Sequence, residues 1–406
     1  MEQLITSASD LLYKSFKVRP EQTRIKYVRH HSQNSDHFGA QGFFNPNGYE
    51  AHIQEGNTPV LLHEYHGHGT FFENTALGTK LAHQSSSPGQ KKEAVPLDYR
   101  LLVESNAVWT EGFLLDGLDE KRQLERRLQE WQRMDFMKGQ AQLGSWKDIY
   151  ERIKQYEREI GKHDLWYRFG FPRVVDKSIL IEIAKEKLGD RFDKLRFLFH
   201  FGSKDPGSDI DLCAILEDDC PTQPYQHGRQ IIDLVEFQYS EWQRDLQRRA
   251  LPATEPVMTG DCVYGDETQF LAIRKQLKEE APALGTQTSL LERSRKCLSH
   301  VFQWSNPQLF IGVNSPSKGL AFTLNELAYA LSCFDAWCQY RAGKKIVTLQ
   351  ELKQSDPALS KAINLRKNWE QEANLDYFGT IQDFVHHTER RLAESIQLTS
   401  PLTITI

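Results

Sequence analysis

The pattern of apolar and polar positions changes twice along the chain. Residues 24–53 contain short strand-like runs, and residues 112–162 place their apolar side chains at helical spacing. The stretch 199–216 reads as an apolar strand, a Gly-Ser turn, a short loop and a second strand, and another strand follows at 229–239. From 267 to 395 nearly every segment has the period of a helix. We therefore expect an α/β (α+β) fold: a mainly helical part with a short sheet, then a small mixed sheet, then a helical bundle.

The length of the chain supports more than one domain. A chain of 406 residues is longer than a single hydrophobic core normally serves, so two or three domains are expected. The sequence GFPR, which begins at Gly170, is a natural junction because Gly and Pro interrupt regular structure. We place the domains at 1–170, 171–266 and 267–406.

Two aspartates at alternate positions distinguish the second central strand. Side chains two residues apart on a strand share a face, so the carboxylates of Asp209 and Asp211 are expected side by side. Their mutual repulsion favours a cation between them, and Mg²⁺ binds through carboxylates together with substrate phosphates. Gly202 and Ser203 lie on the preceding turn, which can bring backbone N–H groups and a hydroxyl to a phosphate. This combination indicates phosphoryl or nucleotidyl transfer.

The order of a strand, Gly202-Ser203, a spacer of five residues and Asp209-Ile210-Asp211 resembles the signature of the DNA polymerase β-type nucleotidyltransferases. The helical end of the chain resembles the bundle that follows this core in the aminoglycoside-type and minimal members. The resemblance implies that residues 171–266 form the nucleotidyltransferase core, and that Ser208 contacts the nucleotide together with Gly202 and Ser203.

The same resemblance implies a third carboxylate on a neighbouring strand. Asp233 fits this role, and Glu236 is the alternative, three residues further and therefore on the opposite face. The implied reaction transfers a nucleoside monophosphate from an NTP, expected to be ATP, to a hydroxyl of a small molecule, an RNA end or a protein. Mg²⁺ ions held by Asp209, Asp211 and Asp233 would neutralise the triphosphate and lower the pKa of the attacking hydroxyl.

A histidine-rich sequence lies in the first part of the chain. His63 and Glu64 are followed by His68, which gives the spacing HExxxH, with His66 between them. Zinc peptidases more often use HExxH, where two histidines share one face of an α-helix. A step of five residues turns an α-helix by about 500°, so His63 and His68 would share a face only if the helix carried a π-bulge.

Residues 25–165 resemble the gluzincin-type zinc metallopeptidases, some of which use HExxxH followed by a second ligand-bearing helix. The sequence around Glu111, WTEGF, is similar to that second helix. The resemblance implies Zn²⁺ held by His63, His68 and Glu111, with Glu64 as the base that activates water. Glu104, one or two helical turns earlier, is the alternative third ligand. Exposed histidines in a loop or at a helix start are the competing interpretation.

Two further functions stay open at this point. The chain could be a zinc metallopeptidase in which the nucleotidyltransferase-like part serves as a regulatory or recognition domain. It could also be an interaction protein with degenerate sites, in a defence or toxin–antitoxin-type system. A hydrolase paired with a nucleotidyltransferase would suit such a conditional system.

Composition narrows the partners only slightly. The formal net charge of −5 does not indicate nucleic-acid binding, although a local basic groove would permit it. The six cysteines include no CxxC pair, which favours reduced thiols and a cytoplasmic protein. No apolar run is long enough to predict a membrane span or a signal peptide.

Overall fold

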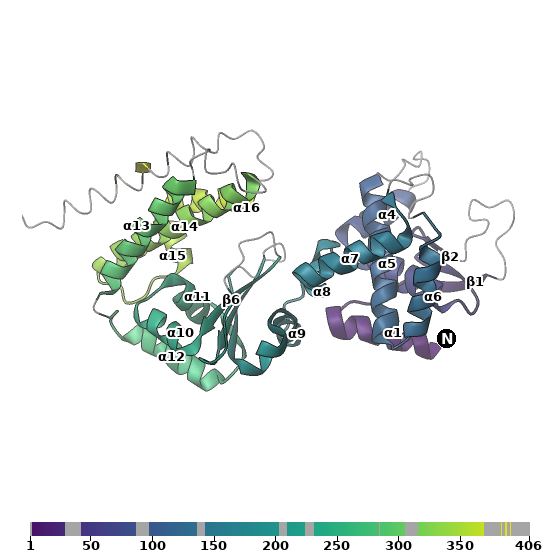
Figure 1. Cartoon of the computed structure of the whole chain (residues 1–406), viewed down its shortest axis with the longest axis horizontal. Coiled ribbons are helices and arrows are strands. Elements are labelled where there is room, and N and C mark those ends of the chain that lie inside the picture. Colours follow the sequence, from purple (N-terminus) through teal and green to yellow (C-terminus); the bar gives the residue numbers. More distant parts are fainter. Residues whose placement is uncertain are drawn as a thin grey trace, which may run out of the picture. The chain divides into compact units, whose positions relative to one another are not determined.

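The computed structural model divides the chain into two compact units (Figure 1). It describes residues 2–28, 42–86, 97–135, 143–202, 209–223, 231–283, 285–304 and 316–368, with four separate positions between 383 and 390. The first unit comprises residues 1–189 with 205–209 and 230–232, and the second comprises 190–204, 210–229 and 233–406. The mixed helical and stranded composition confirms the expected α+β fold class.

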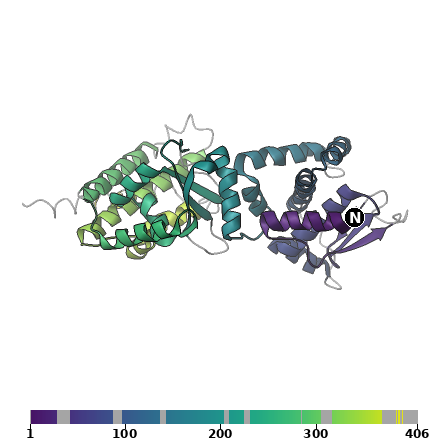
Figure 2. The same ribbon diagram turned by 90° about the horizontal axis from the view of Figure 1, so that it is seen from below.

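The first unit is mainly helical with one small sheet. Its elements are α1 (Glu2–Phe16), β1 (Arg24–Val28), β2 (Gly42–Asn45), β3 (Glu50–Gln54), α2 (Thr58–Leu61), the π-helix η1 (Leu62–Gly69), α3 (Thr70–Asn74), α4 (Ala76–Ser86), α5 (Leu97–Gly117), α6 (Lys121–Trp131), α7 (Trp146–Ile160), α8 (Lys162–Arg168) and α9 (Lys177–Leu188). Figure 2 shows α1, which begins at the N label, and the strands of the same unit.

The small sheet has the order β1-β3-β2. β2 and β3 are antiparallel and joined by the predicted turn, whereas β1 pairs with β3 in the parallel direction. The inner side of β3 carries Ala51 and Ile53, which pack with Val60 and Leu61 at the start of the helical run. β3 therefore packs against the helical turn that leads into η1.

The π-helix lies directly against α5. Gly67 has no side chain at the crossing, where an added Cβ would stand 2.7 Å from Cα and 2.9 Å from Cβ of Ala107. Asn106, on the same helix, donates a hydrogen bond from Nδ2 to the carbonyl oxygen of Gly67 at 3.1 Å. This bond satisfies a backbone carbonyl inside the protein, where an unpaired one would be costly. Gly67 thus permits the close contact that brings α5 to the histidines.

Capping residues account for several helix boundaries of the first unit. Asn57 accepts a hydrogen bond from the backbone N–H of Val60, and Ser145 forms a capping box with Asp148 at the start of α7, as its sequence predicts.

The first unit extends to Gly189, beyond the predicted boundary at residue 170. Accordingly α9 bonds within it: the Lys187 ammonium donates to the carbonyl oxygen of Ile160 at 2.7 Å.

The second unit begins with a four-stranded sheet and its flanking helices. Its elements are η3 (Gly189–Lys194), β4 (Leu195–Phe201), β5 (Ile210–Leu216), β6 (Ile232–Gln238), α10 (Tyr239–Gln247), α11 (Leu251–Thr259), β7 (Asp261–Tyr264), α12 (Glu267–Glu279), α13 (Thr286–Trp304), α14 (Pro316–Arg341), α15 (Leu349–Ser355) and α16 (Pro357–Asn368). The strand order is β6-β5-β4-β7. Apolar residues of β4 and β5 pack with Trp242 and Phe270 of the flanking helices.

One predicted element of the second unit is wrong in part. The sequence of residues 256–266, PVMTGDCVYGD, predicts strand and turn throughout, but the segment up to Thr259 ends the helix α11, and the strand β7 starts at Asp261. Pro256 lies inside that helix, and Val257 is fully buried against the sheet. Burial of this apolar turn overrides the local preference of proline against helix interiors.

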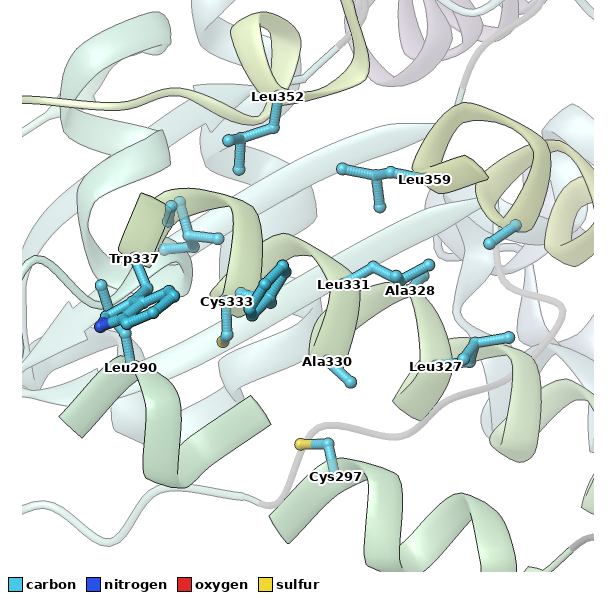
Figure 3. Packing of buried hydrophobic residues seen from close by; sticks show 14 of the residues in the cluster. Leu290, Cys297, Leu327, Ala328, Ala330, Leu331, Cys333, Trp337, Leu352 and Leu359 are labelled. Atoms are coloured by element: carbon cyan, nitrogen blue, oxygen red, sulfur yellow. The ribbon is translucent and has the colours of Figure 1, made fainter. Parts of the chain in front are cut away.

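The helices α13 to α16 form a second hydrophobic cluster around α14 (Figure 3). Figure 3 shows Leu331 and Cys333 on α14, with Leu290 and Cys297 on α13 and Leu359 on α16. Cys333 is fully buried in this cluster, so its thiol is part of the core. None of the described helices is both long and apolar enough to cross a bilayer.

The contact at Gly67 yields a stability prediction. Replacing Gly67 by Ala should lower the free energy of unfolding by about 1–3 kcal/mol, because the new methyl group meets the backbone of Ala107. Thermal or urea unfolding measures the change. The matched control is Gly48→Ala on an exposed turn, where the new Cβ meets only the movable Glu50 side chain; its effect should stay within about 0.5 kcal/mol. Equal stability of the two variants would contradict the described packing.

Candidate metal and nucleotide sites

The π-helical register places His63 and His68 on one face. In a π-helix residue i bonds to residue i+5, so side chains five apart are aligned, and η1 spans both histidines. Their rings lie 4.9 Å apart between centroids and nearly perpendicular, at 84°. Two histidines five residues apart share one face only where the helix is locally a π-helix, and η1 is such a segment.

Glu104 of α5 faces both histidines. Its Oε2 lies 3.6 Å from Nε2 of His63 and 3.6 Å from Nε2 of His68. Three ligand atoms bound tetrahedrally to one zinc ion at about 2.1 Å would lie about 3.4 Å apart, close to these separations. Two imidazole nitrogens and one carboxylate oxygen form the ligand set of many catalytic zinc sites. The donor types and the two distances from Glu104 therefore fit a zinc ion.

Glu64 borders the same site. Its Oε2 is 3.8 Å from Nε2 of His68, and one ligand atom each of His63, Glu64 and His68 lie within 4.8 Å of one another. The carboxyl group is buried, and burial raises its pKa to about 7. β2 passes beside it, because a Cβ on Gly42 would lie 3.2 Å from Cγ of Glu64.

Glu111 lies on the other side of the His63 ring. Its Oε2 is 3.1 Å from Nδ1 of His63, and its Oε1 accepts a hydrogen bond from Nε of Arg127 at 2.8 Å. The two candidate third ligands thus occupy different places. Glu104 faces the Nε2 atoms of both histidines, and Glu111 contacts only the far nitrogen of one. The side chain of Glu111 is fully buried.

The two histidines have opposite electrostatic environments in the absence of a metal ion. Burial alone would lower the pKa of His63, but hydrogen bonds to Glu104 and Glu111 outweigh it and raise the pKa to about 10. Burial lowers the pKa of His68 to about 4. Burial would raise the pKa of Glu104, but the nearby His68 and His63 lower it. The carboxylates thus concentrate negative charge around His63.

His66 is not an exposed histidine of a loop. It is completely buried on η1, its Nε2 lies 3.1 Å from Oγ of Ser9, and burial lowers its pKa to about 3. A neutral, buried imidazole against α1 indicates a packing role. The interpretation that the histidine-rich stretch is a solvent-exposed loop is therefore wrong.

Asp211 and Asp233 lie on neighbouring strands of the second unit. Asp211 is in β5 opposite Phe201 of β4, and Asp233 is in β6, which lies next to β5. Gly202 follows β4 with φ of +80°, and a Cβ there would be 2.2 Å from Oδ2 of Asp211. Only glycine combines that backbone conformation with so close an approach to a carboxylate.

The remaining nucleotide-site residues are distributed differently. Asp209 was expected on the strand, but it precedes β5, which begins at Ile210. Its side chain is about half exposed, and Oδ1 lies 3.7 Å from Nη1 of Arg173. Ser203 and Ser208, predicted to contact the nucleotide, lie outside the described residues.

Glu236 is engaged in a structural ion pair. Its two carboxylate oxygens accept hydrogen bonds from the guanidinium of Arg191, with 3.0 Å between Nη2 and Oε1, and the backbone N–H of Gln223 donates to it at 2.8 Å. The Glu236 side chain is only 5% exposed. Its oxygens are therefore already used in this ion pair and in the bond from Gln223.

The comparisons with known proteins give little beyond this geometry. No family model and no curated protein matches the chain. Among solved structures, a nucleotidyltransferase-like protein from Exiguobacterium sibiricum is similar over 50% of this chain and 70% of its own, with 13% identity and a TM-score of 0.24. A likeness of this size is distant, so the functional argument rests on the residues themselves.

Sequence reasoning missed Arg127. It lies in the charge-rich run of α6, which has the pattern of a solvated helix face, yet its side chain is only 13% exposed. Its guanidinium also lies over the ring of Trp131, 5.4 Å from the centroid. The available signal was the neighbouring apolar pattern of Leu124, Leu128 and Trp131, which turns one face of α6 inward.

The Arg191–Glu236 pair yields a prediction for the second unit. Glu236→Ala should lower the free energy of unfolding by about 2 kcal/mol, since it leaves a partly buried guanidinium and the N–H of Gln223 without their acceptor. Chemical denaturation followed by circular dichroism measures the loss. Glu241→Ala removes an exposed partner of Arg244 and should change stability by less than about 1 kcal/mol. A smaller effect at residue 236 than at residue 241 would refute the assignment.

Proposed function

We propose that the first unit is a zinc-dependent peptidase. The observation that carries this proposal is the convergence of Nε2 of His63, Nε2 of His68 and Oε2 of Glu104, with the Glu64 carboxylate beside them. In this proposal Glu104, the alternative ligand named from the sequence, is the third ligand, and Glu111 orients His63. A zinc ion bound there would polarise the scissile carbonyl and acidify a water molecule.

The chain's own residues supply the proton transfers. Glu64 lies next to the ligand atoms and is buried, so it can accept a proton from the attacking water and deliver it to the departing amine. Only one carboxylate is needed for both steps, because it is deprotonated at the start and again after the amine leaves.

The strand β2 favours an extended polypeptide as the substrate. It is at one side of the sheet order β1-β3-β2, and among the described strands it pairs only with β3. Gly42 lies near Glu64, and the ring of Phe44 lies 6.1 Å from that of His68. A peptide that added to this edge through backbone hydrogen bonds would pass the catalytic residues.

Metal content and hydrolysis test this proposal together. The wild-type chain should bind about one zinc ion and cleave unstructured peptides, and chelation should abolish cleavage. Glu64→Gln should retain zinc and lose roughly 10²–10⁴-fold in kcat, as expected for loss of a general base. His68→Asn and Glu104→Gln should lose zinc.

The comparison of Glu104→Gln with Glu111→Gln separates the two candidate ligands. Glu104→Gln should bind zinc far more weakly than Glu111→Gln, as measured by competition with a chromophoric chelator. The reverse order would restore Glu111 as the ligand. A wild-type chain that binds no zinc would refute the proposal.

We also propose that the second unit is a Mg²⁺-dependent nucleotidyltransferase that uses an NTP, with ATP as the first candidate. The specific support is that Asp211 and Asp233 lie on neighbouring strands, beside a glycine whose backbone approaches the Asp211 carboxylate. Mg²⁺ supplied with the nucleotide would be held by these two carboxylates. The residues then orient the α-phosphate for in-line attack by a hydroxyl, with pyrophosphate as the leaving group.

Pyrophosphate release tests the second proposal. With Mg²⁺ and each of the four NTPs in turn, the wild-type chain should release pyrophosphate or label an added acceptor. Asp211→Asn and Asp233→Asn should each reduce transfer by at least about 10²-fold. Asp219→Asn alters an exposed aspartate of the same unit and should leave the rate unchanged.

The outcome also decides whether the second unit is an active nucleotidyltransferase or a regulatory or recognition domain. If zinc-dependent cleavage is present but no NTP supports transfer, the nucleotidyltransferase-like part would serve regulation or recognition. In that case the Asp211 and Asp233 variants should alter peptide cleavage or substrate choice and not nucleotide transfer.

A further inference from the structure

The pair of Arg127 and Glu111 lies behind the proposed zinc site. Glu111 joins the two sides: one carboxylate oxygen is at His63 Nδ1 and the other accepts from Arg127 Nε. Both side chains are largely withdrawn from water, with Glu111 fully buried and Arg127 13% exposed. A buried carboxylate of this kind is stable as an anion only when it is paired and hydrogen-bonded.

The direction of the hydrogen bond fixes the state of the His63 ring. A charged carboxylate can only accept, so the Glu111 contact requires a proton on Nδ1 of His63. On binding a metal ion the ring would give up its other proton, so the lone pair would lie on Nε2, the atom that faces Glu104. The tautomer that Glu111 selects is therefore the one that a metal ion needs.

Charge balance gives Arg127 a specific part in this arrangement. Three carboxylates surround His63, those of Glu64, Glu104 and Glu111, and each contributes to its electrostatic environment. A bound Zn²⁺ would balance two of them, and the guanidinium of Arg127 balances the third. The hydrogen bond from Arg127 also fixes the Glu111 side chain, so that its other oxygen stays directed at Nδ1 of His63.

Arg127 is itself held in place from α6. Its Nη1 donates to Glu130 one turn later at 3.0 Å, and its guanidinium lies over Trp131. On the other side of His63, the ring of Trp146 lies 5.6 Å from the imidazole ring between centroids. The position of the His63 ring thus depends on residues from α5, α6 and α7.

We propose that Arg127 is a positioning residue of the zinc site, which acts through Glu111 to hold His63 with Nε2 directed at the metal. This inference rests on the proposed zinc site. It assigns to α6 a role in metal affinity, so any change in how α6 packs changes zinc binding.

Zinc affinity of the full chain tests the role of Arg127. Arg127→Met should raise the zinc dissociation constant by about 10–100-fold, the range typical of outer-shell partners of metal-binding histidines. Arg127→Lys, which keeps the charge but loses the planar guanidinium, should fall between Met and the wild type. The matched control is Glu130→Gln, which removes only the exposed partner of Arg127 and should shift the constant by less than about threefold.

A spectroscopic measurement separates positioning from stability. Cobalt(II) replacing zinc should give a visible absorption spectrum in Arg127→Met that differs in band position from that of the wild type, because the ligand field at His63 changes. Thermal melting of the metal-free proteins shows whether the fold persists. If Arg127→Met does not fold, Glu111→Gln with Arg127→Met removes both buried charges, and this double variant should still bind zinc more weakly than the wild type.

The outcomes are distinct from those of the proposed function. A wild-type chain without zinc affinity would refute the zinc site itself. A wild-type chain that binds zinc, with a folded Arg127→Met or double variant of equal affinity and unchanged cobalt spectrum, would refute the role of Arg127 alone. Weaker binding by a folded variant with a shifted cobalt spectrum supports it.

Discussion

The first unit depends on the contact between the π-helix η1 and α5. A π-helical register aligns His63 with His68, and the missing side chain at Gly67 lets α5 approach until Ala107 lies against the backbone of η1. The carbonyl of Gly67 is paired with Asn106, so the irregular turn leaves no buried carbonyl unsatisfied at this point. This one crossing sets where Glu104 and Glu111 stand relative to the histidines. π-Turns are rare and unfavourable in themselves, and they are frequent at functional sites.

The charges around His63 follow from the same packing. Placing several carboxylates about buried imidazoles is unfavourable unless cations compensate them. The ion pair of Glu111 with Arg127 supplies one cation from the protein. The remaining carboxylates, Glu104 and Glu64, are those that the proposed zinc ion would neutralise. In that proposal metal affinity would depend on helix packing, because the guanidinium that pairs with Glu111 comes from a separate helix.

In the second unit the order of the strands places two aspartates on neighbouring strands. Asp211 and Asp233 come from separate strands, and Gly202 allows the chain to turn tightly next to Asp211. The two acidic residues of β6 lie three positions apart and therefore point to opposite faces of the strand. Glu236 binds Arg191 on its face. Glu236 also lies on a strand next to β5, but its ion pair with Arg191 accounts for its burial.

Local patterns in the sequence determined much of this protein. The hairpin before the histidines, the capping of α7 by Ser145, the buried α14 and the strands around the Gly-Ser turn follow from periodicity and turn chemistry, which act over a few residues. The HExxxH spacing identified a π-bulge as the condition under which His63 and His68 share a face, and η1 meets that condition.

Tertiary structure alone decided which glutamate faces both histidines. Glu104 and Glu111 lie seven residues apart on α5, two turns of a helix, so both point towards the same side and sequence spacing cannot separate them. What distinguishes them is the place along α5 where η1 makes contact, at Asn106 and Ala107. For the same reason Arg127 had the pattern of a solvated charge, since its burial depends on a helix contact that local sequence does not encode.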